Sequence, residues 1–323
     1  MQNQVQDRKL SVVFLDRGSL DATLPTLNFD HQWTEYSSTP HSEIVQRLKG
    51  ADIAITNKIP ISRETIKQLP DLKFIGVAAT GTNIIDIEAC RERQITVSNI
   101  PEYARSSVPE HTFALILALR RQLKAYTEEV RRGAWNKSEQ FCLLNHPVRD
   151  LAGSRLGVIG YGTLGKAVAQ LGLAFGMELY VYNRSPIDDP RAVQASLSEV
   201  LETSDVVTLH LPLNEQTRNM IAAPQLKAMK RSAILVNTSR GGLVHEVDIA
   251  HALTHGVIAG AGFDVLTSEP PKQGNPLLDL DLPNFLLTPH VAWASQEAMA
   301  SLATQLVANV HAFVSGRPQN CVS

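Results

Sequence analysis

The sequence of 323 residues has few of the features that mark secreted or membrane proteins. It contains only three cysteines, Cys90, Cys142 and Cys321, which are far apart, odd in number and without C-x-x-C spacing. Such a set favours free thiols in a reducing compartment over a disulfide framework or a cysteine-bound metal. The N-terminal segment has no long apolar run, which argues against a signal peptide and against a membrane span. We therefore expect a cytoplasmic protein without a membrane partner.

An excess of either charge is also missing, because 30 basic side chains stand against 32 acidic ones. The resulting formal charge of −2 gives no electrostatic reason to expect nucleic acid or an anionic membrane as partner. No tandem repeat or low-complexity tract is present, and a globular chain of this length has room for two domains. His251 and His255 are four residues apart but lack a neighbouring Glu and a third ligand, so we expect no metal.

What the chain does have is a regular alternation of apolar runs with helix-like stretches. In the first hundred residues, strands are expected at 10–15, 51–56, 72–77 and 95–99, with a helix that Ser62 caps between two of them. A second series of strands is expected at 155–160, 178–183, 205–212, 232–237, 257–265 and 285–290. This alternation predicts βαβ units and parallel sheets, and hence two α/β domains with a cleft between them.

Three further segments belong to neither series of strands. A long helical stretch is expected from about 106 to 132, with an apolar stripe on one side. The segment 133–153 is irregular and rich in residues typical of surfaces, which indicates an arm or a long loop. The chain ends with an amphipathic helix at about 295–316.

A glycine-rich turn follows the first strand of the second series. Its sequence, Gly160-Tyr161-Gly162-Thr163-Leu164-Gly165, matches G-x-G-x-x-G between the strand 155–160 and the helix 163–175. In that setting the first glycine permits the tight turn, the second lets a diphosphate approach the backbone, and the third lets the helix pack on the strand. The alternative is an ordinary strand-to-helix turn. We predict a dinucleotide site here, since correctly spaced glycines in this context are costly without a need.

The carboxylate that normally follows such a turn is missing. At the end of the second strand an Asp or Glu would accept hydrogen bonds from the ribose and repel a 2′-phosphate. This sequence instead has Asn183, Arg184 and Ser185, which can tolerate, pair with and donate to a phosphate. We therefore expect a preference for NADP(H) over NAD(H). The alternative is that Arg184 lies on the adenine or points to solvent, and that NAD(H) binds acceptably.

Polar residues follow three later strands, where the carboxyl ends of a parallel sheet line the ligand crevice. They are Arg240, then Asp264 and Glu269, and finally His290. A guanidinium can hold the carboxylate of a 2-oxo acid in two parallel hydrogen bonds, and an imidazolium can protonate the carbonyl oxygen as hydride arrives at the carbon. Each residue alone has a structural alternative: a turn cap for Arg240, a solvated surface position for Glu269, or a histidine near a helix start for His290. Their combination favours catalysis.

These motifs together resemble one family. "GYGTLGKAV", "NTSRGGLV", "AGFDVLTSEP" and "TPHVAWAS" are similar to successive motifs of the D-isomer-specific 2-hydroxyacid dehydrogenases, and "VAATGTNIID" and "EHTFALILAL" extend the similarity to the N-terminal half. The resemblance is strongest to the glycerate dehydrogenase and hydroxypyruvate reductase branch. It implies a Rossmann dinucleotide-binding domain at 101–291 and a flavodoxin-like substrate domain at 1–100 and 292–323, with the active site in the cleft between them.

The resemblance also implies roles for matched positions. Arg240 would bind the substrate carboxylate and carbonyl, His290 would be the general acid, and Glu269 would support His290. Backbone amides around Thr80 and Gly81 would complete the carboxylate site. Trp293 is either a wall of the substrate pocket or a core residue, and we favour the wall.

For the cofactor, the resemblance implies a further set of contacts. Thr163 and Leu164 would lie at the pyrophosphate, Leu211 and Pro212 would line the cofactor groove, and Asp264 would accept from the nicotinamide carboxamide. His210 ends a strand near this region and is either a cofactor neighbour or a structural histidine. The expected cofactor-binding residues are Gly160, Tyr161, Gly162, Thr163, Leu164, Gly165, Asn183, Arg184, Ser185, His210, Leu211, Pro212, Thr238 and Asp264.

The activity that the resemblance implies is reduction of hydroxypyruvate to D-glycerate, and of glyoxylate to glycolate, with NADPH. Two alternatives stay open: a related dehydrogenase acting on D-lactate or another 2-hydroxy acid, and a cofactor-sensing binding protein like the C-terminal binding protein corepressors. The family further implies a homodimer joined through the cofactor domain, with the arm from Trp135 to Leu151 contributing to the contact.

Overall fold

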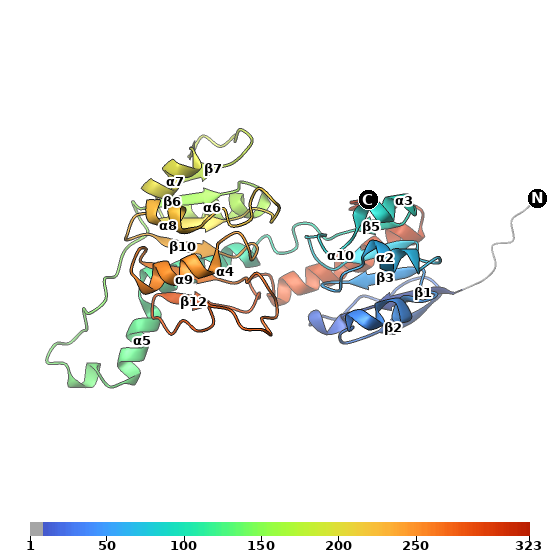
Figure 1. Ribbon diagram of the computed structural model, residues 1–323, viewed down its shortest axis with the longest axis horizontal. Helices are drawn as coiled ribbons and strands as arrows, with labels where there is room; N and C mark the ends of the chain where they lie inside the picture. Colours follow the sequence, from blue (N-terminus) through green and yellow to red (C-terminus); the bar gives the residue numbers. More distant parts are fainter. Residues whose placement is uncertain (1–8) are drawn as a thin grey trace, which may run out of the picture. The chain divides into compact units, whose positions relative to one another are not determined.

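The computed structural model describes residues 9–323, which form two compact units (Figure 1). Unit 1 comprises the chain up to Tyr103 together with Ser295–Ser323, and unit 2 comprises Ala104–Ala294. The boundaries expected from the sequence, after 100 and after 291, lie three residues before these. The first eight residues, for which we predict no signal peptide, lie outside the described residues. In the described part, no helix is long and apolar enough to cross a membrane.

Unit 1 is built on a sheet of five parallel strands in the order β2-β1-β3-β4-β5, the flavodoxin-like order. Both β3 and β4 are buried along their whole length, as expected for strands covered on both faces. The strands are β1 (Leu10–Phe14), β2 (His31–Glu35), β3 (Ile53–Thr56), β4 (Phe74–Val77) and β5 (Thr96–Ser98). The short helices are η1 (Arg17–Ser19), η2 (His41–Glu43), α1 (Ile44–Leu48), α2 (Arg63–Lys67) and α3 (Ile87–Glu92). The Ser62 side chain caps α2 as predicted, accepting a hydrogen bond from the Thr65 amide.

The last helix of the chain, α10 (Gln296–Val314), returns to unit 1 and covers its sheet (Figure 1). The ring of Phe313 stacks on Phe74 of β4 with 4.7 Å between centroids. Leu306 is fully buried and packs where Gly76 leaves room, because a Cβ on Gly76 would lie 3.3 Å from the Leu306 side chain. The tail after α10 pairs with β5, since the Val322 amide donates to the Val97 carbonyl at 2.9 Å.

Unit 2 is built on a sheet of seven parallel strands in the order β12-β11-β10-β9-β6-β7-β8. Numbered from its own first strand and read from β8, this order is 3-2-1-4-5-6-7, which is the Rossmann order with one strand added. The strand order reverses between β6 and β9, and ligands of such sheets bind outside the carboxyl ends at this switch point. The strands are β6 (Arg155–Ile159), β7 (Glu178–Tyr182), β8 (Ala192–Gln194), β9 (Val206–Leu209), β10 (Ile234–Asn237), β11 (Gly260–Phe263) and β12 (Phe285–Leu287).

The helical stretch expected at 106–132 is present but interrupted, because it consists of two helices, α4 (Ser107–Arg120) and α5 (Leu123–Arg131). Gln122 lies between them in the left-handed region, with φ of 56°. Helix α4 packs against β10, β11 and α6, whereas α5 buries only Ala125. The chain therefore leaves the sheet at Arg120, and α5 and the segment after it extend away from the sheet of unit 2 (Figure 1). The remaining helices are η3 (Trp135–Lys137), α6 (Thr163–Ala174), α7 (Leu197–Thr203), α8 (Ala223–Ala228) and α9 (Glu246–Thr254).

Two strands were not expected from the sequence, β2 and β8, and both lie at the edge of their sheets. Their residues are only partly buried or exposed, in contrast to the fully buried central strands. An edge strand pairs on one side only and has no need of a continuous apolar run.

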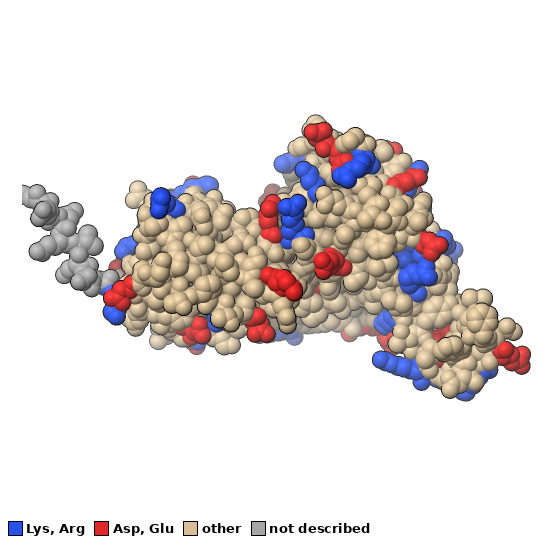
Figure 2. Space-filling view, turned by 180° about the vertical axis from the view of Figure 1, so that it is seen from behind, with Lys and Arg blue, Asp and Glu red and all other residues tan. Residues whose placement is uncertain are grey.

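Charge on the face shown in Figure 2 is mixed, with basic and acidic side chains interspersed.

Replacing Leu306 by Ala tests how much α10 contributes to unit 1. A buried leucine in this packed position should cost about 2–5 kcal/mol of unfolding free energy, because the vacated space cannot fully collapse. The matched control is Thr304→Ala on the exposed side of α10, which should change stability by less than about 0.5 kcal/mol. Urea unfolding followed by circular dichroism measures both, and equal stabilities would show that α10 is not part of the cooperative core.

Candidate functional site

The glycine turn lies at the switch point of unit 2, next to the end of β9. Gly160 follows β6 with φ of +96°, and a Cβ there would lie 2.6 Å from the His210 carbonyl oxygen. A Cβ on Gly165 would lie 2.0 Å from the carbonyl oxygen of Gly160, so α6 packs tightly on the turn. A Cβ on Gly162, by contrast, would meet no atom within 4 Å. The turn is thus closed where the chain packs on itself and open where a diphosphate would approach, and it fits a dinucleotide.

Thr163 and Leu164, the next residues of the turn, begin α6, and its N-cap Gly162 has no side chain to occupy the first amides. Gly162 and Thr163 are exposed and Leu164 is half-buried. The start of a helix of this length is a favourable place for an anion, because its backbone N–H groups and dipole both attract negative charge.

Asn183 takes part in the structure of the turn. Its side-chain oxygen accepts a hydrogen bond from the Tyr161 amide at 3.1 Å, and its side-chain nitrogen donates to the Ser185 carbonyl at 2.9 Å. Arg184 is exposed and makes no hydrogen bond or ion pair with any other residue that the structure describes. The side chain that could pair with a phosphate is therefore available, whereas Asn183 links the end of β7 to the turn.

A carboxylate does contact the turn, although its hydrogen bonds are used within the protein. The Tyr161 hydroxyl donates to Asp189 at 2.8 Å, and Arg191 donates to both oxygens of the same carboxylate at 2.8 and 2.9 Å. The hydrogen bonds of Arg191 and Tyr161 lower the pKa of Asp189, so it stays ionised and paired. Burial and the bond to Asp189 raise the pKa of Tyr161 to about 12. Asp189 is thus a structural partner of the turn.

His210 follows β9, and its imidazole faces the interior. Its Nε2 lies 3.0 Å from the Thr208 hydroxyl, while its Nδ1 is buried and has no hydrogen-bond partner among the described residues. Burial lowers the pKa of His210 to about 4, so the ring is neutral near pH 7. Its carbonyl contacts the glycine turn, so the structure places His210 at the switch point as expected for either of its two proposed roles.

One hydrogen bond joins the loops after β9 and β10, and another lies within the loop after β9. The Ser239 hydroxyl donates to the Leu211 carbonyl at 2.8 Å, and the Pro212 carbonyl accepts from Thr217 at 2.7 Å. Thr238 is buried, with its hydroxyl 2.8 Å from that of Thr112 on α4. Leu211 lies beside the glycine turn, because a Cβ on Gly160 would lie 2.9 Å from its side chain, and Pro212 follows it in the loop after β9. The hydroxyl of Thr238 is bonded to α4.

Glu269 and His290 form a direct hydrogen bond. Nδ1 of His290 lies 2.5 Å from one carboxylate oxygen of Glu269, and the other oxygen accepts from the Leu266 amide at 2.8 Å. Both side chains are partly accessible. A cavity of about 370 Å³ adjoins them and is also lined by Leu266, Leu278 and Pro270. The two residues come from loops after β11 and β12, so the structure brings together a pair that the sequence separates by 21 positions.

Asp264 anchors the loop that carries His290. Its side chain is 1% exposed, and its oxygens accept from the Thr288 hydroxyl at 2.5 Å and from the amides of Val291 and Ala292 at 2.9 and 2.8 Å. Its carbonyl accepts from the His290 amide at 2.8 Å. These bonds hold His290 with φ of +56°, an uncommon conformation for a residue with a side chain, and such strain is often found at functional sites.

Arg240 lies in a loop that packs against the loop of Glu269. A Cβ on the neighbouring Gly241 would lie 1.9 Å from the Leu266 carbonyl oxygen, so the two backbones touch there. The carbonyl of Arg240 accepts from Asn237 at 2.9 Å, and its guanidinium donates to the Ser239 carbonyl at 2.7 Å. The loops of Arg240, Glu269 and His290 thus all follow strand ends at the carboxyl edge of the unit 2 sheet.

Three of the expected substrate residues remain to be placed. Thr80 and Gly81 belong to unit 1 and follow the carboxyl end of β4, where the Thr80 hydroxyl donates to the Ile100 carbonyl at 2.8 Å. Trp293 is half-buried and follows the His290 loop in unit 2.

Sequence reasoning missed His111 of α4, which supports the Asp264 cluster. Its Nε2 lies 2.9 Å from the Thr288 hydroxyl and 3.7 Å from an oxygen of Asp264. No local pattern marks this position, because the contact joins residues 177 apart in the chain. Among residues 9–323, no group of three or more His, Cys, Asp or Glu side chains is placed to hold a metal ion.

Comparison with known proteins identifies the family. The model for the NAD binding domain of D-isomer specific 2-hydroxyacid dehydrogenases matches residues 113–292, more than half of the chain. Glycerate dehydrogenase of Methylorubrum extorquens is 56% identical over 312 residues, which cover 96% of this chain and 98% of that protein. The chain belongs to the D-isomer specific 2-hydroxyacid dehydrogenase family. Another relative, the hydroxypyruvate reductase of Blautia hydrogenotrophica, is 36% identical over 290 residues, which cover 89% of each chain.

Solved structures agree with the fold of this 2-hydroxyacid dehydrogenase. An acyclic imino acid reductase in complex with NADPH and D-Arg superposes with a TM-score of 0.84 at 28% identity, covering 97% of this chain and all of that one. D-lactate dehydrogenase from Aquifex aeolicus, complexed with NAD and lactic acid, superposes with a TM-score of 0.79 at 29% identity, covering 95% and 96% of the two chains. The predicted fold class and family are therefore confirmed, and similar structures exist with each of the two cofactors.

The half-buried His210, whose Nδ1 is buried, should make the stability of the free protein depend on pH. Its pKa is about 4 in the folded chain against an ordinary 6.5, so below pH 6.5 the unfolded chain binds a proton that the folded chain does not. The contribution of the neutral ring to the free energy of unfolding is therefore fully present above pH 6.5, and it is lost as the pH falls toward 4. His210→Gln should lose less unfolding free energy than the wild type between about pH 7.5 and about pH 5 in urea titrations.

The exposed His251 of α9 offers the matched control, because His251→Gln removes a histidine that is not buried. This variant should show the pH dependence of the wild type. A parallel decline in the wild type and in His210→Gln would contradict the assignment.

Proposed function

We propose that this chain reduces hydroxypyruvate to D-glycerate, and glyoxylate to glycolate, with NADPH as the preferred reductant. The hydrogen bond between Glu269 and His290 carries the proposal, because it holds an acid-base group at the carboxyl edge of a dinucleotide-binding sheet. The identity with a glycerate dehydrogenase over nearly the whole chain supports the choice of substrate.

The geometry supports a direct role for the outer nitrogen of His290. Because Nδ1 is bonded to Glu269, Nε2 is the nitrogen that can face a substrate. The reduced nicotinamide, when bound, supplies a hydride to the carbonyl carbon. The imidazolium of His290 gives its proton to the carbonyl oxygen, which completes the hydroxyl group, and Glu269 keeps the ring oriented. Arg240 binds the substrate carboxylate through its guanidinium and so orients the carbonyl.

We propose that Asp264 is a positioning residue. Its carboxylate is buried and accepts from Thr288, Val291 and Ala292, all of which lie in the loop around His290. This arrangement supports a role in fixing the His290 backbone. Acceptance of a hydrogen bond from the nicotinamide carboxamide, expected from the family resemblance, stays a prediction.

The preference for NADPH is supported by what lies at the end of β7. Arg184 is exposed and unpaired among the described residues, and the nearby Asp189 is already bonded to Tyr161 and Arg191. A 2′-phosphate would therefore meet a free guanidinium, while the charge of Asp189 is already compensated by Arg191.

We further propose a cytoplasmic homodimer, with the arm from Trp135 to Leu151 in the contact. Phe141 and Leu144 in this arm are 88% and 85% exposed, and Trp135 is half exposed. Large apolar side chains gathered on one projecting segment are typical of a protein–protein contact. The odd number and wide spacing of the three cysteines support a reducing compartment.

Purified protein assayed with hydroxypyruvate and NADPH should show turnover, and His290→Gln should lower kcat by roughly 10²- to 10⁴-fold, since the proton donor is lost. Cofactor affinity, measured by fluorescence titration, should be unchanged. A panel with glyoxylate, pyruvate and bulkier 2-oxo acids ranks the substrates by kcat/KM. No turnover of any 2-oxo acid would contradict an enzymatic function and favour a cofactor-sensing binding protein, whereas a preference for pyruvate would favour D-lactate dehydrogenase.

Replacing Asn183 by Asp should shift the cofactor preference toward NADH without disturbing the turn. The new carboxylate keeps the oxygen that accepts from the Tyr161 amide, loses the hydrogen bond to the Ser185 carbonyl, and adds a charge that repels a 2′-phosphate. Arg184→Gln should lower kcat/KM with NADPH by roughly 10- to 100-fold, because a charge-assisted hydrogen bond is lost.

The internal control for both variants is kcat/KM with NADH, which should not fall in either. If both cofactors are affected equally, these residues do not distinguish them.

A further inference from the structure

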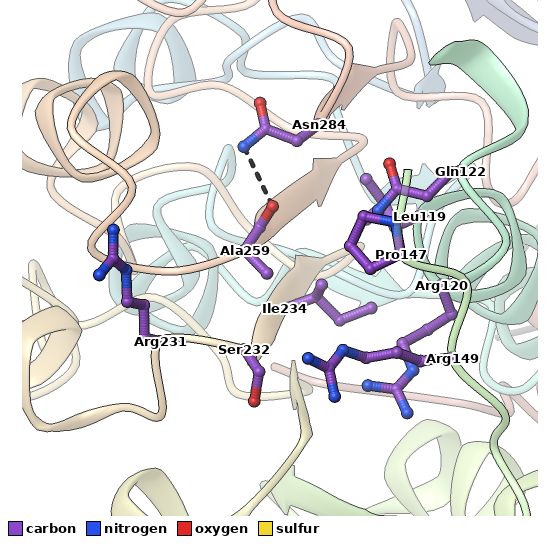
Figure 3. A pocket seen from close by; sticks show the side chains of 10 residues that line it. All are labelled: Leu119, Arg120, Gln122, Pro147, Arg149, Arg231, Ser232, Ile234, Ala259 and Asn284. Carbon is purple, nitrogen blue, oxygen red and sulfur yellow. Dashed lines mark hydrogen bonds between the residues drawn. The ribbon is translucent and has the colours of Figure 1, made fainter. Parts of the chain in front are cut away.

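A second cavity lies at the other edge of the unit 2 sheet. Its volume is about 410 Å³, and Figure 3 shows the side chains around it. Ile234 begins β10, while Ala259 and Asn284 directly precede β11 and β12. The cavity is therefore at the amino ends of the strands whose carboxyl ends lead to Arg240, Asp264 and His290. A strand of four residues spans about 13 Å, which separates this cavity from the proposed catalytic residues.

Among residues 9–323, three arginines and no acidic residue line this cavity. Arg120 and Arg149 extend their guanidinium groups toward Ser232, and Arg231 lies on the opposite side next to Ala259 (Figure 3). The remaining lining residues are neutral and give the cavity an apolar floor with a few amide and hydroxyl groups: Leu119, Gln122, Pro147, Ser232, Ile234, Ala259 and Asn284.

Arg120 is the most constrained of the three arginines. It is only 6% exposed, its Nε is buried with no hydrogen-bond partner among the described residues, and one terminal nitrogen donates to the Asp150 carbonyl at 2.6 Å. Burial lowers the pKa of Arg120, Asp205 raises it, and the charge of Arg149 lowers it further. The guanidinium groups of Arg120 and Arg149 extend toward the same part of the cavity and repel each other (Figure 3), and the buried Nε donor of Arg120 is unused.

The nearby carboxylates are engaged elsewhere. Asp205 pairs with Lys230 at 3.1 Å and accepts from the Arg155 amide at 3.0 Å. Asp150 is largely exposed and pairs with Arg121 at 2.9 Å. Arg149 itself makes no side-chain hydrogen bond or ion pair with the residues that the structure describes. The protein therefore leaves the positive charge of Arg120 and Arg149 only partly compensated.

We propose that this cavity is a second ligand site, which binds a small organic polyanion carrying phosphate or at least two carboxylates. An anionic group between the guanidinium groups of Arg120 and Arg149 would relieve their repulsion. A second anionic group would reach the terminal nitrogens of Arg231 across the cavity, since its Nε already donates to the Gly256 carbonyl at 3.2 Å. At about 30 Å³ per water molecule, the volume equals about 14 waters, which suits a metabolite the size of a tricarboxylate.

The site also joins the arm to the sheet. The Arg149 amide donates to the Arg120 carbonyl at 3.0 Å, so the returning end of the arm is bonded to the last turn of α4. Pro147 and Arg149 line the cavity from the arm, and Ile234 lines it from β10. A bound polyanion therefore contacts both, and should favour the arrangement in which they lie together.

Isothermal titration calorimetry with citrate and, separately, with inorganic pyrophosphate tests the site without requiring turnover. Ionic strength is held constant with KCl, because non-specific binding of anions is screened by salt. The wild type should bind at least one of the two probes. Arg149→Gln should weaken that binding by roughly 10-fold or more, since a charge-assisted contact is lost, and Arg231→Gln should weaken it as well.

Two control variants locate the binding. Arg121→Gln removes a neighbouring exposed arginine that pairs with Asp150 and does not line the cavity, and it should bind like the wild type. Arg240→Gln removes the proposed substrate clamp and should also keep the binding, so failure of the proposed function leaves this test intact. Comparison of citrate with pyrophosphate shows whether carboxylates or phosphates are preferred.

The proposal is overturned if the wild type binds neither probe, or if Arg121→Gln weakens binding as much as Arg149→Gln. It is also overturned if binding disappears in Arg240→Gln and persists in Arg149→Gln, because the anion then occupies the catalytic site. Sedimentation velocity of the same variants tests whether a second copy of the chain, instead of a polyanion, occupies the cavity. A change of oligomeric state in Arg149→Gln, without probe binding to the wild type, would make the cavity part of a contact between copies of the chain.

Discussion

The buried carboxylate of Asp264 is the interaction on which the catalytic side of unit 2 depends. It follows β11, yet the groups that donate to it, from Thr288, Val291 and Ala292, all follow β12. Because a buried charge without partners is very costly, these bonds define the path of the chain on both sides of His290. His290 is thereby held in a left-handed conformation that places its ring against Glu269. Asp264 therefore positions His290, the residue proposed to transfer the proton.

The parallel sheet of unit 2 separates the proposed catalytic residues, at the carboxyl ends of its strands, from the arginine-lined cavity at their amino ends. At the carboxyl edge, the glycine turn, Arg240 and His290 follow strands β6, β10 and β12. At the amino edge, the starts of β10, β11 and β12 line a cavity with three arginines. Every strand runs in the same direction, so each connection between strands supplies residues to both edges. One sheet can therefore carry a catalytic site and a separate anion site without sharing a side chain.

Much of the fold was predictable, because central parallel strands are buried on both faces and must be apolar along their whole length. Strands such as β4 and β10 are recognisable for this reason. The edge strands β2 and β8 are partly exposed, and their sequences carry no such signal. The helix break at Gln122 was missed as well, because helical periodicity continues across it. Helix α4 ends where the chain no longer packs against the sheet. This tertiary contact leaves no signal in the local sequence.

For the site, the sequence by itself determined which chemical groups are present and that each follows a strand: the glycine turn, the missing carboxylate after β7, and Arg240, Glu269 and His290. Strand direction then requires them to share one edge of the sheet. Only the tertiary structure decided that Asn183 bonds to the turn, that Asp264 and His111 support the His290 loop, and that Arg120 and Arg149 lie together in a cavity. These contacts join residues 22 to 177 positions apart, and their strength depends on burial and exact distance, which spacing along a chain does not contain.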